Sequence, residues 1–327
     1  MSLHSSANAP ARRGPPAPRG PARLAAAGPA LLDGRAPPAV PQARGPGRAE
    51  AGAGAAESPG PHQALLVLDI ETVPDTEQVP AGWPSEKFPK AAWHKVVAVS
   101  FVEAAIARDA ATGTEAYRVR SCRSGGEPGW DEERLLRAFW KFFAAGRYRV
   151  VTWNGRSFDL PTLLLRSMMH GIAVPSWYRR GTKWDGYGHR YAVDWHSDLM
   201  EVLAEFGACA RLTLEEAAGL LALPGKMGEH GSEVAALIAR GEIGRVRAYC
   251  ETDCLNLFVV YLRWAHLTGR TSSEAHDAAV DGLIRYLGAE RAGRPHLGGF
   301  VDAWRRASER RPAFVSRPAQ AWPAVTG

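Results

Sequence analysis

The sequence predicts an α/β domain built on a mixed β-sheet, and three observations lead to this prediction. Short apolar segments, typical of buried strands, dominate the chain between residues 64 and 122. Strand and helix patterns then alternate as far as residue 195, and the chain beyond it has mainly helical spacing. Strands first, alternation next and helices last are typical of one α/β domain.

Five segments have strand character. The first, residues 64–70 with the sequence ALLVLDI, is a short apolar run. The Pro-rich stretch 73–89 follows it and is expected to be a loop, since proline interrupts strand pairing. The remaining expected strands span residues 96–102, 115–122, 149–153 and 191–195.

Helices are expected on both sides of the fourth strand and throughout the C-terminal part. Residues 131–145 place five apolar side chains along one helical stripe: Leu135, Leu136, Phe139, Phe142 and Phe143. Residues 160–169 follow, with Pro161 in the first turn, where proline is tolerated. Thr213 and Glu216 form a capping-box pattern, which predicts a helix start. Residues 245–264 predict one long helix.

Residues 1–63 differ from the rest of the chain and are expected to be a disordered tail. They consist mainly of Ala, Pro, Gly and Arg, contain no Phe, Tyr or Trp, and hold seven arginines against three acidic residues. Such a segment buries too little apolar surface to offset the entropy of ordering. A basic arm that touches nucleic acid, a transit peptide and a plain unstructured extension all remain open for it. The chain has a net charge of +6, and the tail accounts for most of it.

Composition also excludes several classes of protein. No run of the ~20 apolar residues that a membrane span requires is present. The four cysteines are too few for a disulfide scaffold, and none forms a C-x-x-C pair, which argues against a zinc ribbon. We therefore expect a protein of a reducing compartment, the cytoplasm, without a membrane partner. The final residues, 311–327, are Pro-rich and are expected to form a loose tail.

Carboxylates recur at three places where the expected elements end or turn. Asp69 and Glu71 stand two apart at the end of the first strand, so their side chains share one face and repel one another unless a cation lies between them. Asp159 stands at the turn from the fourth strand into a helix, in the sequence WNGRSFDLP. As a lone feature it is equally explained as a helix N-cap.

The third of these places is the long C-terminal helix. Tyr249 and Asp253, in the sequence YCETD, are four apart and therefore project from the same side of the helix. Glu251 points elsewhere and is expected to be solvated. Cys250 and Cys254 are interpreted as small packing residues.

The order of these motifs along the chain resembles the DEDD superfamily of 3′–5′ exonucleases. The tyrosine at position 249, with Ala248 where the histidine branch would have histidine, indicates the DEDDy branch. Further segments resemble the predicted 3′–5′ exonucleases related to the proofreading domain of family-B DNA polymerases. These segments are WHKVVAVS (93–100), HSDLMEVL (196–203), LPGKMG (223–228) and YCETDCLNLFVVYLRW (249–264).

The resemblance implies a fold and a chemistry. The fold would be ribonuclease-H-like, a mixed five-stranded sheet flanked by helices, and the reaction would be two-metal hydrolysis of the terminal phosphodiester. Asp69 would bridge two divalent cations, Mg²⁺ or Mn²⁺, and Glu71 and Asp253 would complete the site that holds the nucleophilic water. Asp159 would support the second cation, and Tyr249 would orient the attacking water. The resemblance covers most of residues 65–267.

Contacts to the substrate are implied in the same way. Thr72, Asn154 and Phe158 resemble the positions that touch the terminal nucleotide. Lys226 is a candidate phosphate contact or an exposed loop lysine, and Asp198 is interpreted as an N-cap or a structural partner. Basic residues interleaved with aromatic ones suit a single-strand path and lie between the second and third motifs: Arg179, Arg180, Lys183 and Arg190.

The leading hypothesis is a metal-dependent 3′–5′ exonuclease that acts on 3′ ends of single-stranded DNA, in DNA repair or with a polymerase in trans. An exoribonuclease using the same residues and a nucleic-acid-binding module without catalysis remain alternatives, because no motif reports on the 2′-hydroxyl. A small-molecule phosphoesterase on the same fold is a further alternative. We expect three parts: the tail 1–63, an exonuclease domain 64–270, and a helical C-terminal extension 271–327.

Overall fold

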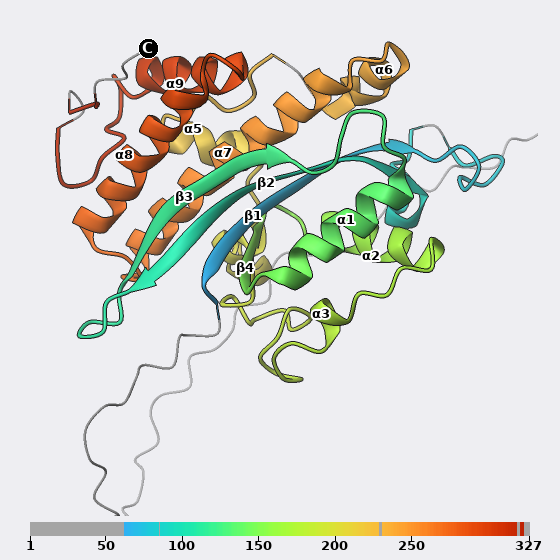
Figure 1. The fold of residues 1–327 in the computed structure, drawn as a ribbon, viewed down its shortest axis with the longest axis horizontal. Coiled ribbons are helices and arrows are strands. Elements are labelled where there is room, and N and C mark those ends of the chain that lie inside the picture. The colour runs from blue at the N-terminus through green and yellow to red at the C-terminus, as the bar shows by residue number, and fades with distance from the viewer. Residues whose placement is uncertain (1–61, 85, 229–230, 319–320, 324–327) are drawn as a thin grey trace, which may run out of the picture. The chain divides into compact units, whose positions relative to one another are not determined.

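A five-stranded mixed sheet in the order β3-β2-β1-β4-β5 organises the fold (Figure 1). The computed structural model describes residues 62–84, 86–228, 231–318 and 321–323. The chain divides into two units, Met1–Ala56 and Glu57–Gly327, and all described residues belong to the second. The disorder predicted for residues 1–63 therefore lies almost entirely outside the described part of the chain.

Antiparallel and parallel strand pairs are combined in this sheet, as predicted. The strands are β1 (Ala64–Pro74), β2 (His94–Arg108), β3 (Glu115–Ser124), β4 (Tyr148–Thr152) and β5 (His196–Asp198). β1, β2 and β3 pair antiparallel, while β4 pairs parallel with both β1 and β5. Parallel neighbours need a crossover connection, and helices supply it on each side of β4.

Helices cover both faces of the sheet. Those before β5 are α1 (Glu132–Ala145), α2 (Asp159–Met169) and α3 (Pro175–Tyr178). Those after it are α4 (Leu199–Leu203), α5 (Leu214–Leu220), α6 (Val234–Ala239), α7 (Ile243–Leu267), α8 (Ser273–Glu290) and α9 (Pro295–Ala307). None of the described helices combines the length and the apolar character that a membrane crossing requires.

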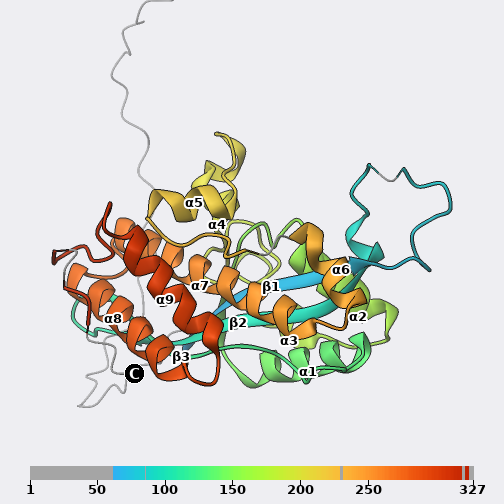
Figure 2. The same ribbon diagram turned by 90° about the horizontal axis from the view of Figure 1, so that it is seen from above.

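β1 separates two hydrophobic cores because its side chains alternate between the faces of the sheet. Leu66 and Leu68 pack into the core that includes α1 and α2. Leu65 and Val67 pack into the core that includes α7, α8 and α9. In Figure 1, α1 to α3 accordingly lie on the opposite side of the sheet from α7 to α9. Figure 2 shows the chain between β1 and β2 projecting beyond the end of the sheet.

Two sequence expectations about this fold are wrong. The strand expected at residues 191–195 is a series of turns, in which Trp195 and His196 both donate backbone hydrogen bonds to the Ala192 carbonyl. Ala192 and Trp195 are buried because the turns pack against the core, whereas Tyr191 is exposed, and the actual strand follows at His196–Asp198.

The second wrong expectation concerns the loose tail. Within the described residues 311–318, Phe314 is buried, and the backbone N–H groups of Val315 and Ser316 donate to the Asp277 carboxylate at 2.8 and 3.0 Å. A buried ring and two backbone hydrogen bonds hold this segment against α8 even though its sequence has no periodic pattern.

Candidate active site

Asp69 and Glu71 lie where β1 leaves the core. They follow Leu65 and Val67 in the alternation, so their side chains point to the face that α7 covers. The register between β1 and β2 shifts directly after Glu71, between Glu71 and Thr72. Such a bulge twists a strand locally and re-aims its side chains, and it ends the regular part of β1 at the two carboxylates.

A tight turn after β4 positions Asp159. Asn154 adopts a left-handed backbone conformation with φ of 63°, which Asn tolerates better than most residues. A Cβ on Gly155 would lie 2.3 Å from the Thr152 side chain, so only glycine fits there. Asp198 accepts the backbone N–H groups of Asn154 and Arg156, each at 2.9 Å, and so acts as a structural partner of the turn.

Asp159 itself begins α2, and the N-cap position belongs to Phe158. The interpretation of Asp159 as an N-cap is therefore wrong. Its carboxyl group is buried and lies close enough to the Ile70 backbone and the Asp69 side chain for both to influence its pKa. The turn thus places the Asp159 carboxyl group at the end of β1, where the first two carboxylates lie.

α7 brings the third motif to the same place. Tyr249 and Asp253 share one helix face, as their spacing of four residues allows, and each group shifts the pKa of the other. The Cys250 thiol lies 3.5 Å from Oδ2 of Asp69. α7 therefore closes over the carboxylates of β1 from the face to which they point.

The four carboxyl groups lie close enough to resist ionisation together. Burial, followed by the charges of Asp159 and Glu71, raises the pKa of Asp69 well above its usual value. Burial and then the charge of Asp253 raise the pKa of Glu71. Burial raises the pKa of Asp159 to about 7 and that of Asp253 to about 6. Without a bound cation, these carboxyl groups therefore keep their protons at pH values at which ordinary carboxyl groups release them.

The donor set suits a divalent cation. The ligand atoms of Asp69, Glu71 and Cys250 all lie within 4.8 Å of one another. Carboxylate oxygens are the ligands that Mg²⁺ and Mn²⁺ prefer. The interpretation of Cys250 as a small packing residue misses its position beside the site. It stands three residues before Asp253, and the i, i+3 spacing on a helix is the sequence signal for that position.

Two of the three predicted substrate contacts, Thr72 and Phe158, touch one histidine that the sequence interpretation did not single out. Thr72 Oγ1 lies 3.0 Å from Nδ1 of His94. The Phe158 ring meets the His94 ring edge-on, with centroids 5.0 Å apart. Asn154 lies in the turn described above, four residues before Phe158. His94 belongs to the segment WHKVVAVS, and the resemblance of that segment to the exonuclease family was the sequence signal that could have identified this histidine.

Lys226 lies on a loop that is fixed to α7. Gly225, with φ of 63°, accepts a hydrogen bond from the Asn256 amide at 2.9 Å and donates one to it at 3.3 Å. Asn256 stands three residues after Asp253. The positive charge of Lys226 acts on Glu71 and Asp253, because it opposes the rise in pKa of both carboxyl groups.

Two other expectations about polar residues are corrected by their contacts. Arg180 donates to the carbonyls of Ala144 and Gly146 at the end of α1, and Arg190 donates to Glu201 at 2.7 Å. These two side chains therefore stabilise the fold, which leaves only Arg179 and Lys183 of that stretch available to a strand.

Glu251 is the other corrected residue, since it is buried rather than solvated. Its carboxylate accepts a hydrogen bond from Ser124 at 2.8 Å and pairs with Arg294 and His296. Arg294 and His296 follow Glu251 by more than forty residues and pair with its charge. A local sequence pattern does not reveal partners at that distance along the chain.

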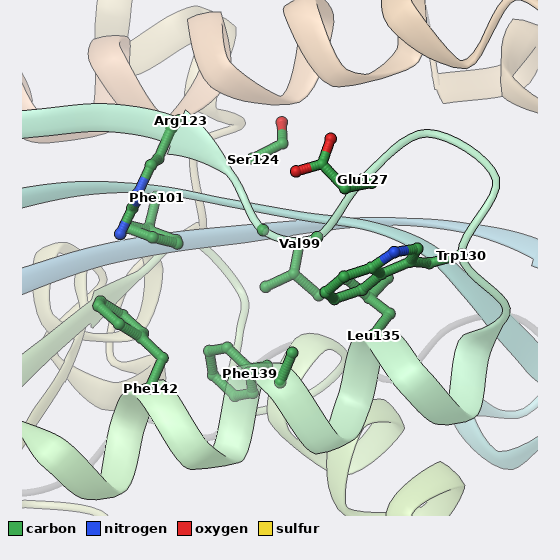
Figure 3. Close-up of a pocket in the computed structure, with 12 residues that line it drawn as sticks. Val99, Phe101, Arg123, Ser124, Glu127, Trp130, Leu135, Phe139 and Phe142 are labelled. Carbon is green, nitrogen blue, oxygen red and sulfur yellow. The ribbon is translucent and has the colours of Figure 1, made fainter.

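A separate cleft of about 310 Å³ opens between β2, β3 and α1 (Figure 3). Its walls include Val99, Phe101 and Phe142, which belong to the α1 side of the sheet. Asp69 and Glu71 point to the other side. The cleft is therefore distinct from the carboxylate site, and its lining consists mainly of aromatic and aliphatic side chains with Arg123 and Glu127.

The mixed five-stranded sheet with helices on both faces defines a ribonuclease-H-like fold. Residues 86–304 match the family described as predicted 3′–5′ exonuclease related to the exonuclease domain of PolB, and the chain belongs to this family. Asp159, Tyr249 and Asp253 lie inside the matched range, whereas Asp69 and Glu71 precede it. The match also continues through α8 and into α9.

Comparison with solved structures returns 61 matching chains, one of which is the family B DNA polymerase of the hyperthermophilic archaeon Pyrobaculum calidifontis. The identity is 19% and the TM-score is 0.38, and the match covers 72% of this chain and 30% of the polymerase. This chain thus corresponds to less than a third of that polymerase. No curated protein matches the chain.

Proposed function

We propose that this protein is a metal-dependent 3′–5′ exonuclease that hydrolyses the terminal phosphodiester of single-stranded DNA. One observation carries the proposal: four buried or half-buried carboxyl groups from three separate elements converge beside one tyrosine hydroxyl. Bringing them together is costly for stability, because like charges repel and burial penalises each charge. Such a cost is typical of a functional site.

Asp69, Glu71, Asp159 and Asp253 would hold two divalent cations, Mg²⁺ or Mn²⁺. The raised pKa values of all four groups support the fit, and the ligand atoms of Asp69 and Glu71 lie within 4.8 Å of one another. When bound, the cations would stabilise charge on the phosphodiester and make a bound water more acidic. The carboxylates would neutralise the cations, and the positions of the three elements would set where the scissile bond lies.

Tyr249 would act as a hydrogen-bond donor. Burial, followed by the charge of Asp253, raises the pKa of its hydroxyl above the usual value, so the phenol stays protonated at neutral pH. The hydroxyl lies close enough to Asp253 to oppose the rise in pKa of that carboxyl group. Its task in hydrolysis would be to orient the attacking water, since a group that keeps its proton is a poor base.

Thr72, Asn154 and Phe158 would contact the nucleotide at the 3′ end. Thr72 follows Glu71, and Phe158 precedes Asp159, so both lie next to carboxylates in the chain. Lys226 would meet a backbone phosphate, because it is exposed and its charge already reaches two of the carboxylates. A polymerase that shares the same 3′ ends would be a partner in trans.

We also propose the cytoplasm as the location of this activity. All four cysteines are free, and Cys209 is exposed, which suits a reducing compartment.

The decisive experiment compares 5′-labelled single-stranded DNA and RNA of matched sequence, each incubated with protein and Mg²⁺ or Mn²⁺ and analysed for shortening from the 3′ end. EDTA and the Asp69→Ala variant should abolish the ladder. Asp185→Ala, which removes an exposed carboxylate elsewhere, should leave it unchanged. A faster reaction on RNA would replace the DNA assignment with an exoribonuclease. Binding without any ladder would support a binding module that has lost catalysis.

A further inference from the structure

Three aromatic rings from separate parts of the chain form a cluster: Phe88 on the segment between β1 and β2, which projects in Figure 2, His94 at the start of β2, and Phe158 directly before α2. The Phe88 ring stacks on the His94 ring, with centroids 4.7 Å apart and an interplanar angle of 29°. Phe158 approaches both rings, at 5.5 Å from Phe88 and 5.0 Å from His94. Phe88 is 71% exposed, so one side of this ring cluster faces solvent.

The cluster lies next to the carboxylate site. His94 contacts Thr72, whose chain neighbour is Glu71, and Phe158, whose chain neighbour is Asp159. His94 therefore connects the exposed Phe88 ring to the chain neighbours of two of the four carboxylates. A nucleotide end at the carboxylates would lie on the side of the molecule that carries this ring cluster.

His94 is held in one orientation. Its Nε2 lies 3.3 Å from the Pro89 carbonyl, which can only accept, so Nε2 carries the proton. Nδ1 then accepts from the Thr72 hydroxyl at 3.0 Å. With both nitrogens occupied, the imidazole is a neutral, fixed surface that supports the Phe88 ring from beneath.

We infer that Phe88 and the His94 ring beneath it form a binding site for the nucleobase at the 3′ end of the substrate. This inference rests on the proposed function. An exposed aromatic ring on a fixed support is the surface on which single-stranded bases stack. Lys87 and Lys90, both exposed, flank Phe88 in the sequence against one exposed acid, Glu86, and provide positive charge for the adjoining phosphates.

The inference defines what the site recognises. A ring face binds any base and makes no contact with the 2′-hydroxyl, so the contribution of Phe88 should be equal for DNA and RNA and independent of base identity. Removing the ring should weaken binding by about 5- to 150-fold, the effect of losing one base–aromatic stack.

The test uses full-length protein in the Asp69→Ala background with Mg²⁺, so that the oligonucleotide stays intact. Single-stranded DNA carries 2-aminopurine either at the 3′ terminus or ten nucleotides upstream. Stacking on Phe88 should quench the fluorescence of the terminal probe and not that of the upstream probe. Phe88→Ala should abolish the quenching and weaken binding, Phe88→Leu should do the same, and Phe88→Trp should restore both.

Tyr178→Ala is the matched control, because Tyr178 is 69% exposed and lies on α3, outside the ring cluster. It should leave quenching and affinity unchanged. Equal quenching in Phe88→Ala and in the parent protein, with an unchanged circular dichroism spectrum, would overturn the inference. If the wild-type protein shortens 3′ ends but Phe88→Ala keeps normal quenching, only this inference fails. If the protein neither binds nor shortens any strand, the proposed function and this inference fail together.

Discussion

His296 Nε2 lies 2.7 Å from Oε2 of Glu251, and this contact joins the first turn of α9 to the helix that carries Tyr249 and Asp253. Arg294 reaches the same carboxylate from just before α9, and Ser124 reaches it from the end of β3. The start of α9 is thereby attached to α7 two residues before Asp253, and the family match, residues 86–304, includes both partners of this contact.

The Glu251→Gln variant should lower the free energy of unfolding at pH 7 by about 3 kcal/mol, because it leaves Arg294 without its buried partner. Burial raises the pKa of Glu251, but the His296 hydrogen bond and the Arg294 charge outweigh it and lower the pKa below 4.5. The ion-pair contribution is therefore present above pH 4.5 and is lost as pH falls further. Urea unfolding of both proteins at pH 7 and in acid measures this difference.

Glu290→Gln is the control for that prediction. Glu290 approaches Arg294 at 3.8 Å, but its side chain is 41% exposed, and an exposed pair contributes little. Equal losses in the two variants would contradict the assignment of Glu251 as the anchoring carboxylate.

Asp159→Asn should stabilise the metal-free protein at pH 8. Burial raises the pKa of Asp159 from 3.8 to about 7, so its contribution to stability is present at low pH and is lost as pH rises from about 4 through about 7. The variant avoids that loss, and we expect a gain on the order of 2–4 kcal/mol at pH 8 in EDTA. Scanning calorimetry at pH 4 and pH 8 measures it.

Addition of Mg²⁺ should reverse the order of stability, because the cation stabilises the ionised wild-type site more than the variant. A variant that is less stable than the wild type at pH 8 in EDTA would show that the ionised Asp159 carboxylate does not destabilise the metal-free protein.

Tyr249→Phe should reduce the rate of hydrolysis by about 10²-fold or less, as expected when a positioning group is lost. Cation binding should be retained, because the phenol is not one of the four carboxylates. Single-turnover rates and a calorimetric titration with Mn²⁺ separate the two effects. Unchanged kinetics would remove Tyr249 from the mechanism.

Asp198→Asn should loosen the turn that positions Asp159. The carboxylate accepts two backbone N–H groups, whereas an amide offers one acceptor atom and brings an N–H₂ group of its own. We expect a loss of about 1–3 kcal/mol of stability and a fall in kcat larger than the rise in KM. The His189→Ala variant changes a residue outside this turn and should leave the ratio of kcat to KM unchanged. A change in KM alone would assign Asp198 to substrate binding instead.

Short-range patterns predicted the local geometry of these residues correctly. The spacing of two on a strand places Asp69 and Glu71 on one face of β1, and the spacing of four on a helix places Tyr249 and Asp253 on one face of α7. The capping box of Thr213 and Glu216 is present as predicted. Each of these relationships depends on the geometry of a few consecutive residues, which the local sequence encodes.

Residues with distant partners were misjudged. Glu251 looked solvated because its partners lie in another helix, and Arg180 looked available because the carbonyls it binds belong to α1. The apolar segment 191–195 resembled a strand, although it forms turns that bury Ala192 and Trp195 against the core. A periodic pattern reports that a residue is buried or polar, but not which distant group it meets.

The sequence by itself determined the order of the strands and helices along the chain, the three acidic motifs and the resemblance to a family of exonucleases. Only the tertiary structure decided that Cys250 lies against Asp69, that His94 joins Thr72 to the ring of Phe158, and that Arg294 and His296 neutralise Glu251. The physical reason is range. Backbone periodicity acts over a few residues, whereas burial, charge pairing and raised pKa values arise between groups that meet only once the sheet and its helices have packed.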